Sequence, residues 1–230
     1  MDSFQDQPDI RRKIILRHGK VPVLLYNTRM GKLITIVGAS GVGKTALVKA
    51  LSRASPFSIA YEQHAERPFQ ALFKQDKRYA LANQIDYFLL RAEQERELRA
   101  SPRIGLMDGG LDLDFHAFTR LFLSRNLLTD PEYDLCRRVY AFIRASLPGP
   151  ELIVRLWADD ITVADRLSGR KRINIAGAED TALFNSFLDE WLASVPSDQV
   201  LRLDVSKETL DYNRSVEQIL NHIQSRGDFI

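Results

Sequence analysis

The sequence predicts an α/β fold in which a mainly parallel sheet is covered by helices on both faces. Two observations lead to this prediction. Short apolar stretches alternate with longer amphipathic segments along the chain, and the apolar stretches are hydrophobic throughout, as is typical of strands buried on both faces. In addition, a glycine-rich segment over residues 38–45 stands between an apolar stretch and a helical pattern. We find no linker that would divide the chain, so residues 1–230 are expected to form a single domain.

The first half of the chain begins with a polar stretch, residues 1–20, which we expect to be a loose arm. Val21–Tyr26 is interpreted as a short strand, and the turn over Asn27–Gly31 suggests that it forms a hairpin with a buried strand at Leu33–Val37. The next expected elements are a helix at 44–54, a strand at 57–61, a long amphipathic helix at 79–99 that ends before Ser101-Pro102, and a strand at 103–107.

The second half is expected to contain more helix than strand. Pro148-Gly149-Pro150 interrupts the chain before an apolar strand, and the sequence between Arg166 and Arg172 is basic. Cys136 is interpreted as a core residue, as are Trp157 and Trp191. The expected elements are helices at 113–126 and 132–147, a strand at 152–158, a helix at 180–194, a strand at 200–205 and a helix at 216–226.

Composition and charge exclude several classes of protein. The 230 residues include 32 Lys+Arg and 30 Asp+Glu, which gives a net charge of +2 and argues against a histone-like protein that coats nucleic acid. The single Cys136 rules out an internal disulfide and fits a reducing compartment. The first residues lack the layout of a secretory signal, and no apolar run approaches the roughly 18 residues of a membrane helix. We therefore expect a cytoplasmic protein with neither nucleic acid nor a membrane as partner.

The strongest motif fits the phosphate-binding pattern G-x4-G-K-[ST]. Its glycines allow the backbone to fold tightly around a phosphate, with successive N–H groups and a helix N-terminus directed at the anion. Lys44 is expected to reach the β and γ phosphates, and the Thr45 hydroxyl to lie on Mg²⁺. The sequence therefore predicts a P-loop NTPase fold with ATP and Mg²⁺ as cofactors. The predicted loop residues are Gly38, Ala39, Ser40, Gly41, Val42, Gly43, Lys44 and Thr45.

The phosphate loop alone does not identify the reaction. The Asn/Thr-Lys-x-Asp signature of guanine-specific GTPases is missing, and a motor or transport ATPase usually needs a longer chain. A small-molecule kinase needs basic residues that close over the phosphates and an acid near the acceptor hydroxyl. The basic stretch after Asp165 and the acid at Glu62 are candidates for these two roles.

Downstream of the loop, the order of motifs over about residues 33–223 resembles the deoxynucleoside kinases of the deoxyadenosine/deoxyguanosine kinase group. The resemblance implies that Glu62, which follows the second expected strand, is the base for the nucleoside 5′-hydroxyl. It also implies that Gln84 reads the base edge, with Arg91 seven residues later in the same helix. Tyr87 is a candidate for lining the nucleoside pocket.

Other parts of the resemblance concern the phosphates and the later strands. An Arg-x3-Arg-x-Arg pattern at Arg166, Arg170 and Arg172 corresponds to the lid, whose guanidinium groups neutralise charge on the moving phosphoryl group. Asp108 ends a strand at the place where P-loop proteins hold Mg²⁺ through an acid or its water. The segments 150–156, 189–192 and 200–205 fall where the family has its Pro-Asp-Leu strand, a Trp-containing helix and its last strand. The family also implies a homodimer formed through long helices.

Two departures from the family pattern concern the acceptor. The strand-end signature Asp/Glu-Arg-Ser is replaced by Asp108-Gly109-Gly110, so the Arg that touches the acceptor hydroxyl is missing. The Glu that follows the lid arginines and binds the sugar 3′-hydroxyl is also absent in register, since 173–177 supplies none and Glu179 is a loose substitute.

The predicted function is ATP-dependent phosphorylation of a (deoxy)nucleoside 5′-hydroxyl. Two alternatives stay open from the residues. One is a nucleoside-monophosphate kinase of the thymidylate kinase kind. The other is a nucleotide-binding regulatory module that has lost catalysis. The two departures from the family pattern are the reason for considering it.

Overall fold

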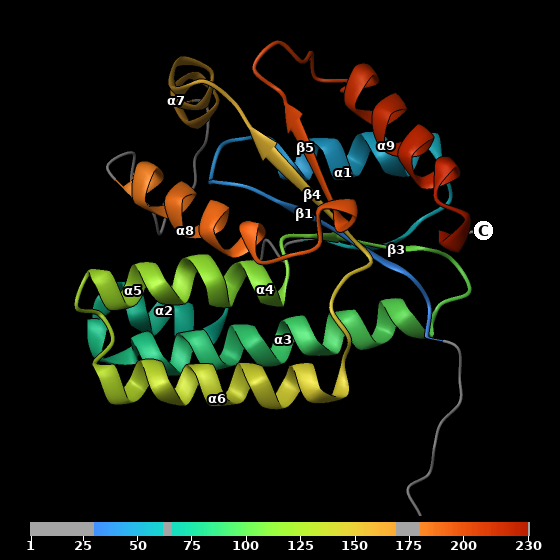
Figure 1. Ribbon diagram of the computed structural model, residues 1–230. Helices are drawn as coiled ribbons and strands as arrows, with labels where there is room; N and C mark the ends of the chain where they lie inside the picture. The colour runs from blue at the N-terminus through green and yellow to red at the C-terminus, as the bar shows by residue number, and fades with distance from the viewer. Residues whose placement is uncertain (1–29, 62–65, 169–179, 230) are drawn as a thin grey trace, which may run out of the picture.

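The computed structural model describes residues 30–61, 66–168 and 180–229. The named elements in these ranges run in the order β1 (Leu33–Val37), α1 (Lys44–Ala54), β2 (Ser58–Ala60), α2 (Pro68–Gln75), η1 (Lys77–Tyr79), α3 (Ala80–Ala100), β3 (Gly105–Asp108), α4 (Leu111–Leu113), η2 (Asp114–Thr119), α5 (Arg120–Ser124), α6 (Asp130–Ser146), β4 (Leu152–Trp157), α7 (Asp160–Ser168), α8 (Thr181–Ala193), η4 (Ser197–Gln199), β5 (Val200–Asp204), α9 (Asn213–Ser225) and η5 (Gly227–Phe229). Figure 1 shows this chain from its blue to its red end.

The sheet of the described residues has five strands in the order β2-β3-β1-β4-β5, and all neighbouring pairs are parallel. β1 lies in the middle, with β3 on one side and β4 on the other. Because every strand runs the same way, the carboxyl ends of β1, β2 and β3 meet at one edge of the sheet. Loops that follow such strand ends are where open α/β sheets bind their ligands.

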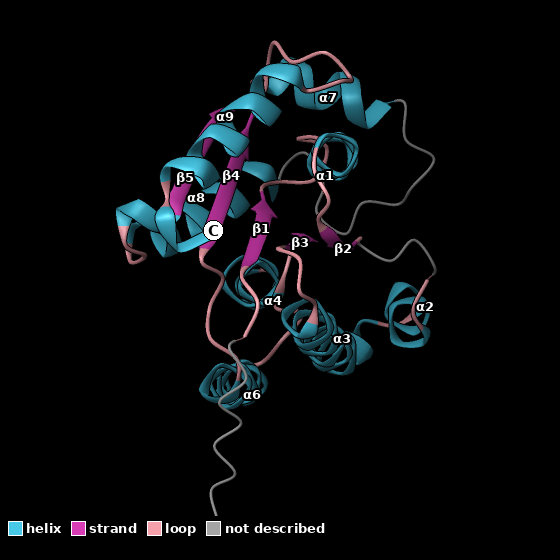
Figure 2. Ribbon diagram, turned by 90° about the vertical axis from the view of Figure 1, so that its right-hand side faces the viewer, coloured by secondary structure: helices cyan, strands magenta, loops and turns pink. Residues whose placement is uncertain are grey.

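Helices cover both faces of the sheet, so the molecule has three layers (Figures 1 and 2). On one face, α1 and α9 pack side by side over a core that includes Ile34, Ile36 and Leu203. On the other face, the helix that begins at Leu111 packs with α8 over Val37, and α3 lies beside α6. Alternate residues of β1 thus point into opposite cores, which explains why the strand is apolar except at Thr35.

The predicted fold class is confirmed, and two expectations about single elements are wrong. β1 cannot form the expected hairpin with Val21–Tyr26, because β3 and β4 occupy both of its edges; residues 21–26 and the expected arm at 1–20 lie outside the described ranges. Trp157 is 47% exposed rather than part of the core, and it is the last residue of β4, where the buried part of the strand ends. Trp191 and Cys136 are buried as expected.

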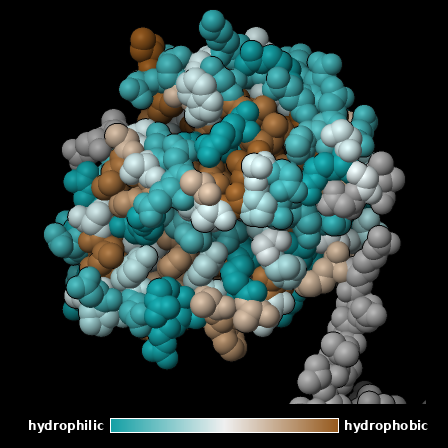
Figure 3. Space-filling model, viewed as in Figure 1, coloured by the Kyte–Doolittle hydropathy of each residue, from teal (hydrophilic) through white to brown (hydrophobic). Residues whose placement is uncertain are grey.

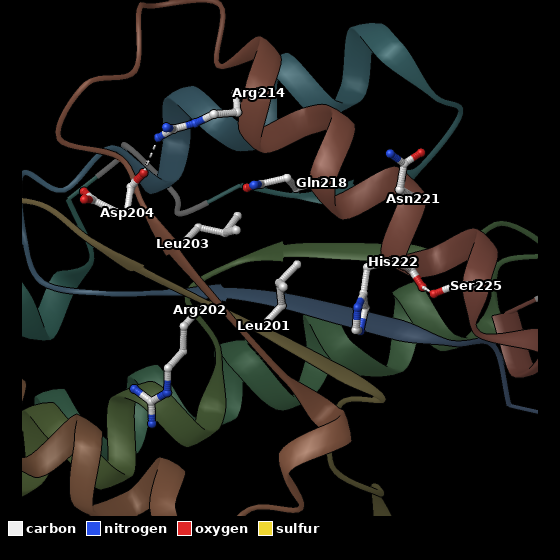
Figure 4. A pocket seen from close by; sticks show the side chains of 9 residues that line it. All are labelled: Leu201, Arg202, Leu203, Asp204, Arg214, Gln218, Asn221, His222 and Ser225. Atoms are coloured by element: carbon white, nitrogen blue, oxygen red, sulfur yellow. Dashed lines mark hydrogen bonds between the residues drawn. The ribbon is translucent and has the colours of Figure 1, made fainter.

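A groove with a volume of about 620 Å³ runs between β5, at one edge of the sheet, and α9. Figure 3 shows it as an apolar hollow in a largely polar face, and Figure 4 shows Leu201 and Leu203 on its floor with Gln218 and Asn221 on α9. None of the predicted site residues that the structure describes lines this groove. Within the described ranges, the helices are all too short or too polar to cross a bilayer.

The amino edge of the sheet is held by Arg99, a buried residue near the end of α3. Its Nη1 donates to the carbonyl oxygen of Gly31 at 2.9 Å and to the Glu151 carboxylate at 3.1 Å, while Nη2 donates to the carbonyl oxygen of Gly149 at 2.7 Å. Glu151 in turn accepts from the backbone N–H of Leu33 at 2.7 Å. This clamp joins the starts of β1 and β4 to α3.

A second ionic network joins α6 to the rest of the helical layer. Arg144 donates to Glu95 on α3 at 2.7 Å and to Asp112 at 2.8 Å, and Asp112 also accepts from the Tyr140 hydroxyl at 2.7 Å. Next to it, His116 lies 3.1 Å from the Tyr140 hydroxyl oxygen and stacks on Trp191 with ring centroids 5.1 Å apart. Burial lowers the pKa of His116 from its ordinary value near 6.5 to about 4, so this ring is neutral at pH 7.

Candidate active site

The predicted phosphate loop follows β1 and leads into α1 at the carboxyl edge of the sheet. Gly43 stands at the N-cap of α1 with a φ of 110°, a conformation that residues with a Cβ rarely adopt. The loop therefore delivers the free N–H groups of the first helical turn to one point, where the helix dipole favours negative charge. This arrangement can bind a phosphate group.

Neighbouring side chains pack closely against the loop glycines. A Cβ at Gly43 would lie 1.9 Å from the hydroxyl oxygen of Tyr212, and a Cβ at Gly41 would lie 2.7 Å from Leu167 Cγ. Tyr212 is itself in the left-handed region with a φ of 51° and is buried. The loop glycines are therefore required both by backbone conformation and by lack of space.

Lys44 begins α1, and its ammonium group lies on the loop. Nζ donates to the carbonyl oxygens of Gly38 at 2.9 Å and Ala39 at 3.1 Å. The side chain is half-buried, so it is held at the loop while its charge stays accessible. Such a placement suits an ammonium group that contacts phosphate oxygens.

Thr45 and Asp108 come together as the sequence predicts for a metal site. The Thr45 hydroxyl donates to Asp108 Oδ2 at 2.5 Å, and Asp108 is buried at the end of β3. A hydroxyl and a carboxylate are the ligand types that Mg²⁺ accepts when waters and phosphate oxygens complete its octahedron. Among the residues that the structure describes, no group of three or more His, Cys, Asp or Glu could hold a metal ion.

Arg166, the first residue of the expected lid, lies at the end of α7 and contacts the loop. Its Nη1 donates to the carbonyl oxygen of Val42 at 2.7 Å, and its Nη2 donates to that of Val205, after β5, at 2.9 Å. The guanidinium also lies 5.9 Å from the centre of the Tyr212 ring. Arg166 thus joins α7 to the phosphate loop and to the end of β5.

Three predicted residues fall outside the described ranges. Arg170 and Arg172 lie in 169–179, and Glu62 lies in 62–65. The gap at 62–65 is flanked by Tyr61, whose carbonyl oxygen accepts from Gln94 Nε2 at 3.4 Å, and by Glu66, which precedes Arg67 at the N-cap of α2. Arg67 forms a two-bond ion pair with Asp86 of α3, at 2.5 and 2.6 Å.

The predicted acceptor residues lie on the buried side of α3. Gln84 is 3% exposed, and its Oε1 accepts from the Thr119 hydroxyl at 3.1 Å. Tyr87 is half-buried on the next turn. Arg91, also 3% exposed, lies one turn further along. These side chains follow one another at helical spacing, so α3 brings them to a common side.

Arg91 connects α3 to the end of β3. Its Nε donates to Asp114 Oδ2 at 3.1 Å, and its Nη1 donates to the carbonyl oxygen of Asp108 at 3.2 Å. A Cβ at Gly109 would lie 3.2 Å from Arg91 Nη2, and Gly109 has a φ of 81°. The position of the missing family Arg is therefore filled from the side by the guanidinium of Arg91.

Asp114 and Thr119 are site residues that the sequence reasoning missed. They begin and end η2, a π-helical stretch between α4 and α5, and the Thr119 hydroxyl donates to the carbonyl oxygen of Asp114 at 2.9 Å. In an α-helix, residues five apart do not share a face, so an α-helical periodicity separates these two. The wider π turn brings both toward α3. The one signal in the sequence is that Asp114 is an acidic residue shortly after Asp108, which ends a strand.

Comparisons with known proteins concern the family and the fold of the chain. The family model for deoxynucleoside kinases matches residues 34–226. A deoxyadenosine/deoxycytidine kinase of Bacillus subtilis (strain 168) is 20% identical over 199 residues, which are 84% of this chain and 92% of that protein.

Solved structures of deoxyadenosine kinase from M. mycoides have the same fold. The structure with the products dCMP and a flexible dCDP has a TM-score of 0.71 at 21% identity and covers 84% of this chain and 100% of its own. The structure with bound dATP has a TM-score of 0.69 at 20% identity and covers 84% and 99%. The structure with bound dCTP has a TM-score of 0.68 at 18% identity and covers 84% and 100%.

Proposed function

Because this chain belongs to the deoxynucleoside kinase family, it is a nucleoside kinase that phosphorylates a deoxynucleoside, and we propose that it transfers the γ-phosphoryl group of ATP to the 5′-hydroxyl. The observation that carries the proposal is the contact between Thr45 and Asp108 beside the phosphate loop. A hydroxyl and a carboxylate side by side next to this loop are ligand types that a nucleotide-bound cation accepts, and this supports the proposal.

The donor half of the site is assigned to the loop over Gly38–Thr45. Its backbone N–H groups hold the phosphates, and Lys44 moves its ammonium group from the carbonyl oxygens of Gly38 and Ala39 to the β and γ phosphates. Thr45 and Asp108 would hold Mg²⁺, which neutralises negative charge on the phosphates when bound. The lid arginines Arg166, Arg170 and Arg172 stabilise charge on the moving phosphoryl group.

The acceptor half is assigned to α3 and to the residue that follows Tyr61. Glu62 accepts the proton of the nucleoside hydroxyl; in the sequence it follows β2, the parallel neighbour of the strand that ends at Asp108. Gln84 and Arg91 read the base edge, and Tyr87 lines the nucleoside pocket. Because both Gln84 and Arg91 already have partners on η2, their polar groups are oriented before the nucleoside arrives, which lowers the entropy cost of binding.

The partners of the enzyme are small molecules and a second copy of itself. The proposal includes neither nucleic acid nor a membrane as a partner. We propose the cytoplasm as the location of the enzyme. The homodimer would form on the outer side of α3 and α6, where Leu89, Leu135 and Phe142 are 53%, 40% and 78% exposed. Leu135 and Phe142 are seven residues apart and so share a face of α6.

A panel of acceptors tests the proposed activity. Purified protein is given ATP and Mg²⁺ with each deoxynucleoside and, separately, with each nucleoside monophosphate, and products are separated by chromatography. We expect monophosphate products from at least one deoxynucleoside. Lys44→Ala should lower turnover by about 10²-fold or more, as loss of a charge-stabilising donor does, while Lys49→Ala, an exposed lysine on the same helix, should leave it unchanged.

Two other results would replace this proposal. Phosphorylation of monophosphates alone would identify a nucleoside-monophosphate kinase. Binding of ATP without transfer of a phosphoryl group to any acceptor would identify a regulatory module. The observation that favours this alternative is Gly109, which stands where the family has the Arg that touches the acceptor hydroxyl.

A further inference from the structure

Arg155 is a buried cation in the middle of the sheet. It lies on β4, pairs in register with Val37 of β1, and is only 3% exposed. Arginine side chains are rarely buried to this extent without a paired charge and a specific role. Arg155 is not among the residues used by the proposed mechanism.

The guanidinium of Arg155 joins the end of β4 to α8. Nη1 donates to the carbonyl oxygen of Leu156, the next residue of the strand. Nη2 donates to Asn185 Oδ1 at 3.0 Å, and Nε lies 3.5 Å from Asp189 Oδ1. Asn185 and Asp189 are one turn apart on α8, so a single side chain fixes this helix to the sheet.

The same guanidinium lies directly against the first residue of the phosphate loop. A Cβ at Gly38 would lie 2.7 Å from the carbonyl oxygen of Leu156 and 3.4 Å from Arg155 Nη1. Gly38 is also the residue whose carbonyl oxygen accepts from Lys44 Nζ at 2.9 Å. Gly38 thus lies between two cations: Lys44 binds its carbonyl oxygen, and the guanidinium of Arg155 borders the space beside its Cα.

The charge of Arg155 is only partly compensated. Its carboxylate partner, Asp189, is 53% exposed and is shared with Arg202, whose Nη1 donates to it at 3.1 Å. Burial lowers the pKa of Arg155, although it stays cationic at neutral pH, and the nearby Asp189 only partly opposes this effect. A buried positive charge beside an anion site favours binding of the anion more strongly than a surface charge does, because water screens it less.

We propose that Arg155 is a positioning residue for the donor phosphates, which fixes the start of the phosphate loop and favours the triphosphate through its buried charge. The inference rests on the proposed function only in requiring that the loop binds ATP. It does not require any particular acceptor.

Binding measurements on the full chain test this proposal without depending on turnover. Titration calorimetry gives the Kd for ATP with Mg²⁺ and for inorganic tripolyphosphate, which reports on the phosphate subsite alone. Arg155→Met keeps the length of the side chain and removes its charge, and Arg155→Lys keeps the charge and loses the fork. We expect about a tenfold rise in both Kd values for Arg155→Met, in the range expected for loss of a charge-assisted interaction, and less than a threefold rise for Arg155→Lys.

Arg202→Met is the matched control. Arg202 pairs in register with Arg155 on the neighbouring strand and shares the partner Asp189, but its side chain is 50% exposed. The Arg202→Met substitution should change the Kd for ATP by less than twofold. If Arg155→Met lowers the melting temperature but leaves both Kd values within twofold of wild type, Arg155 only packs the fold and the proposal is wrong.

Should Arg155→Met fail to fold, Asn185→Ala decides the question, since it removes one acceptor of the guanidinium on α8. A rise of about threefold in the Kd for ATP would support the proposal, and an unchanged Kd would overturn it. Wild-type protein that binds ATP but phosphorylates no nucleoside would refute the proposed function and leave this inference intact.

Discussion

The hydroxyl of Thr45 donates to the carboxylate of Asp108 across a gap of 63 residues in the sequence, with an oxygen–oxygen distance of 2.5 Å. The contact exists because β1 and β3 are parallel neighbours whose carboxyl ends coincide, with Ile36 in register with Asp108. The loop and α1 then carry Thr45 back over the end of β3. Two residue types that suit a nucleotide-bound cation are thus assembled by the sheet itself.

Replacing Thr45 should weaken the use of Mg²⁺. Thr45→Val keeps the shape of the side chain and removes the oxygen, so we expect the Mg²⁺ concentration for half-maximal ATP turnover to rise about tenfold, as for loss of an interaction with a charged partner. Thr45→Ser keeps the hydroxyl, and its Mg²⁺ concentration for half-maximal turnover should lie within threefold of the wild-type value. Equal Mg²⁺ dependence in Thr45→Val and wild type would remove Thr45 from the metal site.

Gly109 should not tolerate the residue that the family has there. Gly109→Ala is expected to destabilise the fold by about 1–2 kcal/mol, the usual cost of a left-handed conformation in a residue with a Cβ, measured by urea unfolding. Gly149→Ala is the control, because a Cβ there meets nothing within 4 Å. Gly109→Arg should also lower turnover, because the new side chain displaces Arg91. A gain of activity in Gly109→Arg would show instead that the missing guanidinium is needed.

His116 should make the fold less stable in mild acid. The folded state holds its pKa at about 4, whereas the unfolded chain takes up a proton near pH 6.5, so stability is complete above that pH and falls as the pH decreases toward 4. Between pH 7 and pH 5 this linkage is worth roughly 2 kcal/mol. Urea unfolding of His116→Gln and wild type at both pH values should show a smaller loss of unfolding free energy in the variant. Equal losses in the two proteins would contradict the lowered pKa of His116.

Phe142 should be important for dimer formation. Phe142→Glu places a charge on the face of α6 that we propose as the interface, and we expect sedimentation velocity to show a monomer. Leu210→Glu is the control, since Leu210 is 87% exposed in the segment between β5 and α9. Wild-type protein that sediments as a monomer, or a Phe142→Glu variant that remains a dimer, would reject this surface.

The parts of the fold that could be predicted are those in which local pattern and tertiary role agree. The phosphate loop is one, because the backbone conformation at Gly43 and the phosphate chemistry of Lys44 already require these residue types, before the packing of Tyr212 adds its own constraint. The strands β1 and β4 are another, since burial on both faces makes them apolar. β2 is shorter than the expected 57–61, covering Ser58–Ala60, as strand ends depend on pairing rather than on residue type.

The parts that could not be predicted depend on contacts between distant segments. Asp114 and Thr119 reach α3 only through a π turn, which no helical periodicity indicates. Arg155 is a polar residue within an otherwise apolar strand, and nothing in the sequence shows that it lies against Gly38. The false hairpin has the same origin, because two adjacent apolar stretches do not reveal that β1 is already paired on both edges.

The Arg99 clamp has a practical consequence for anyone who modifies this enzyme. Substitutions that strengthen an enzyme often reduce its activity, because the stabilised region and the working region are the same. Here the clamp secures the starts of β1 and β4, whereas the phosphate loop follows the opposite end of β1. Thermostability could therefore be engineered around Gly31, Gly149 and Glu151 while the catalytic edge keeps the freedom of movement that turnover requires.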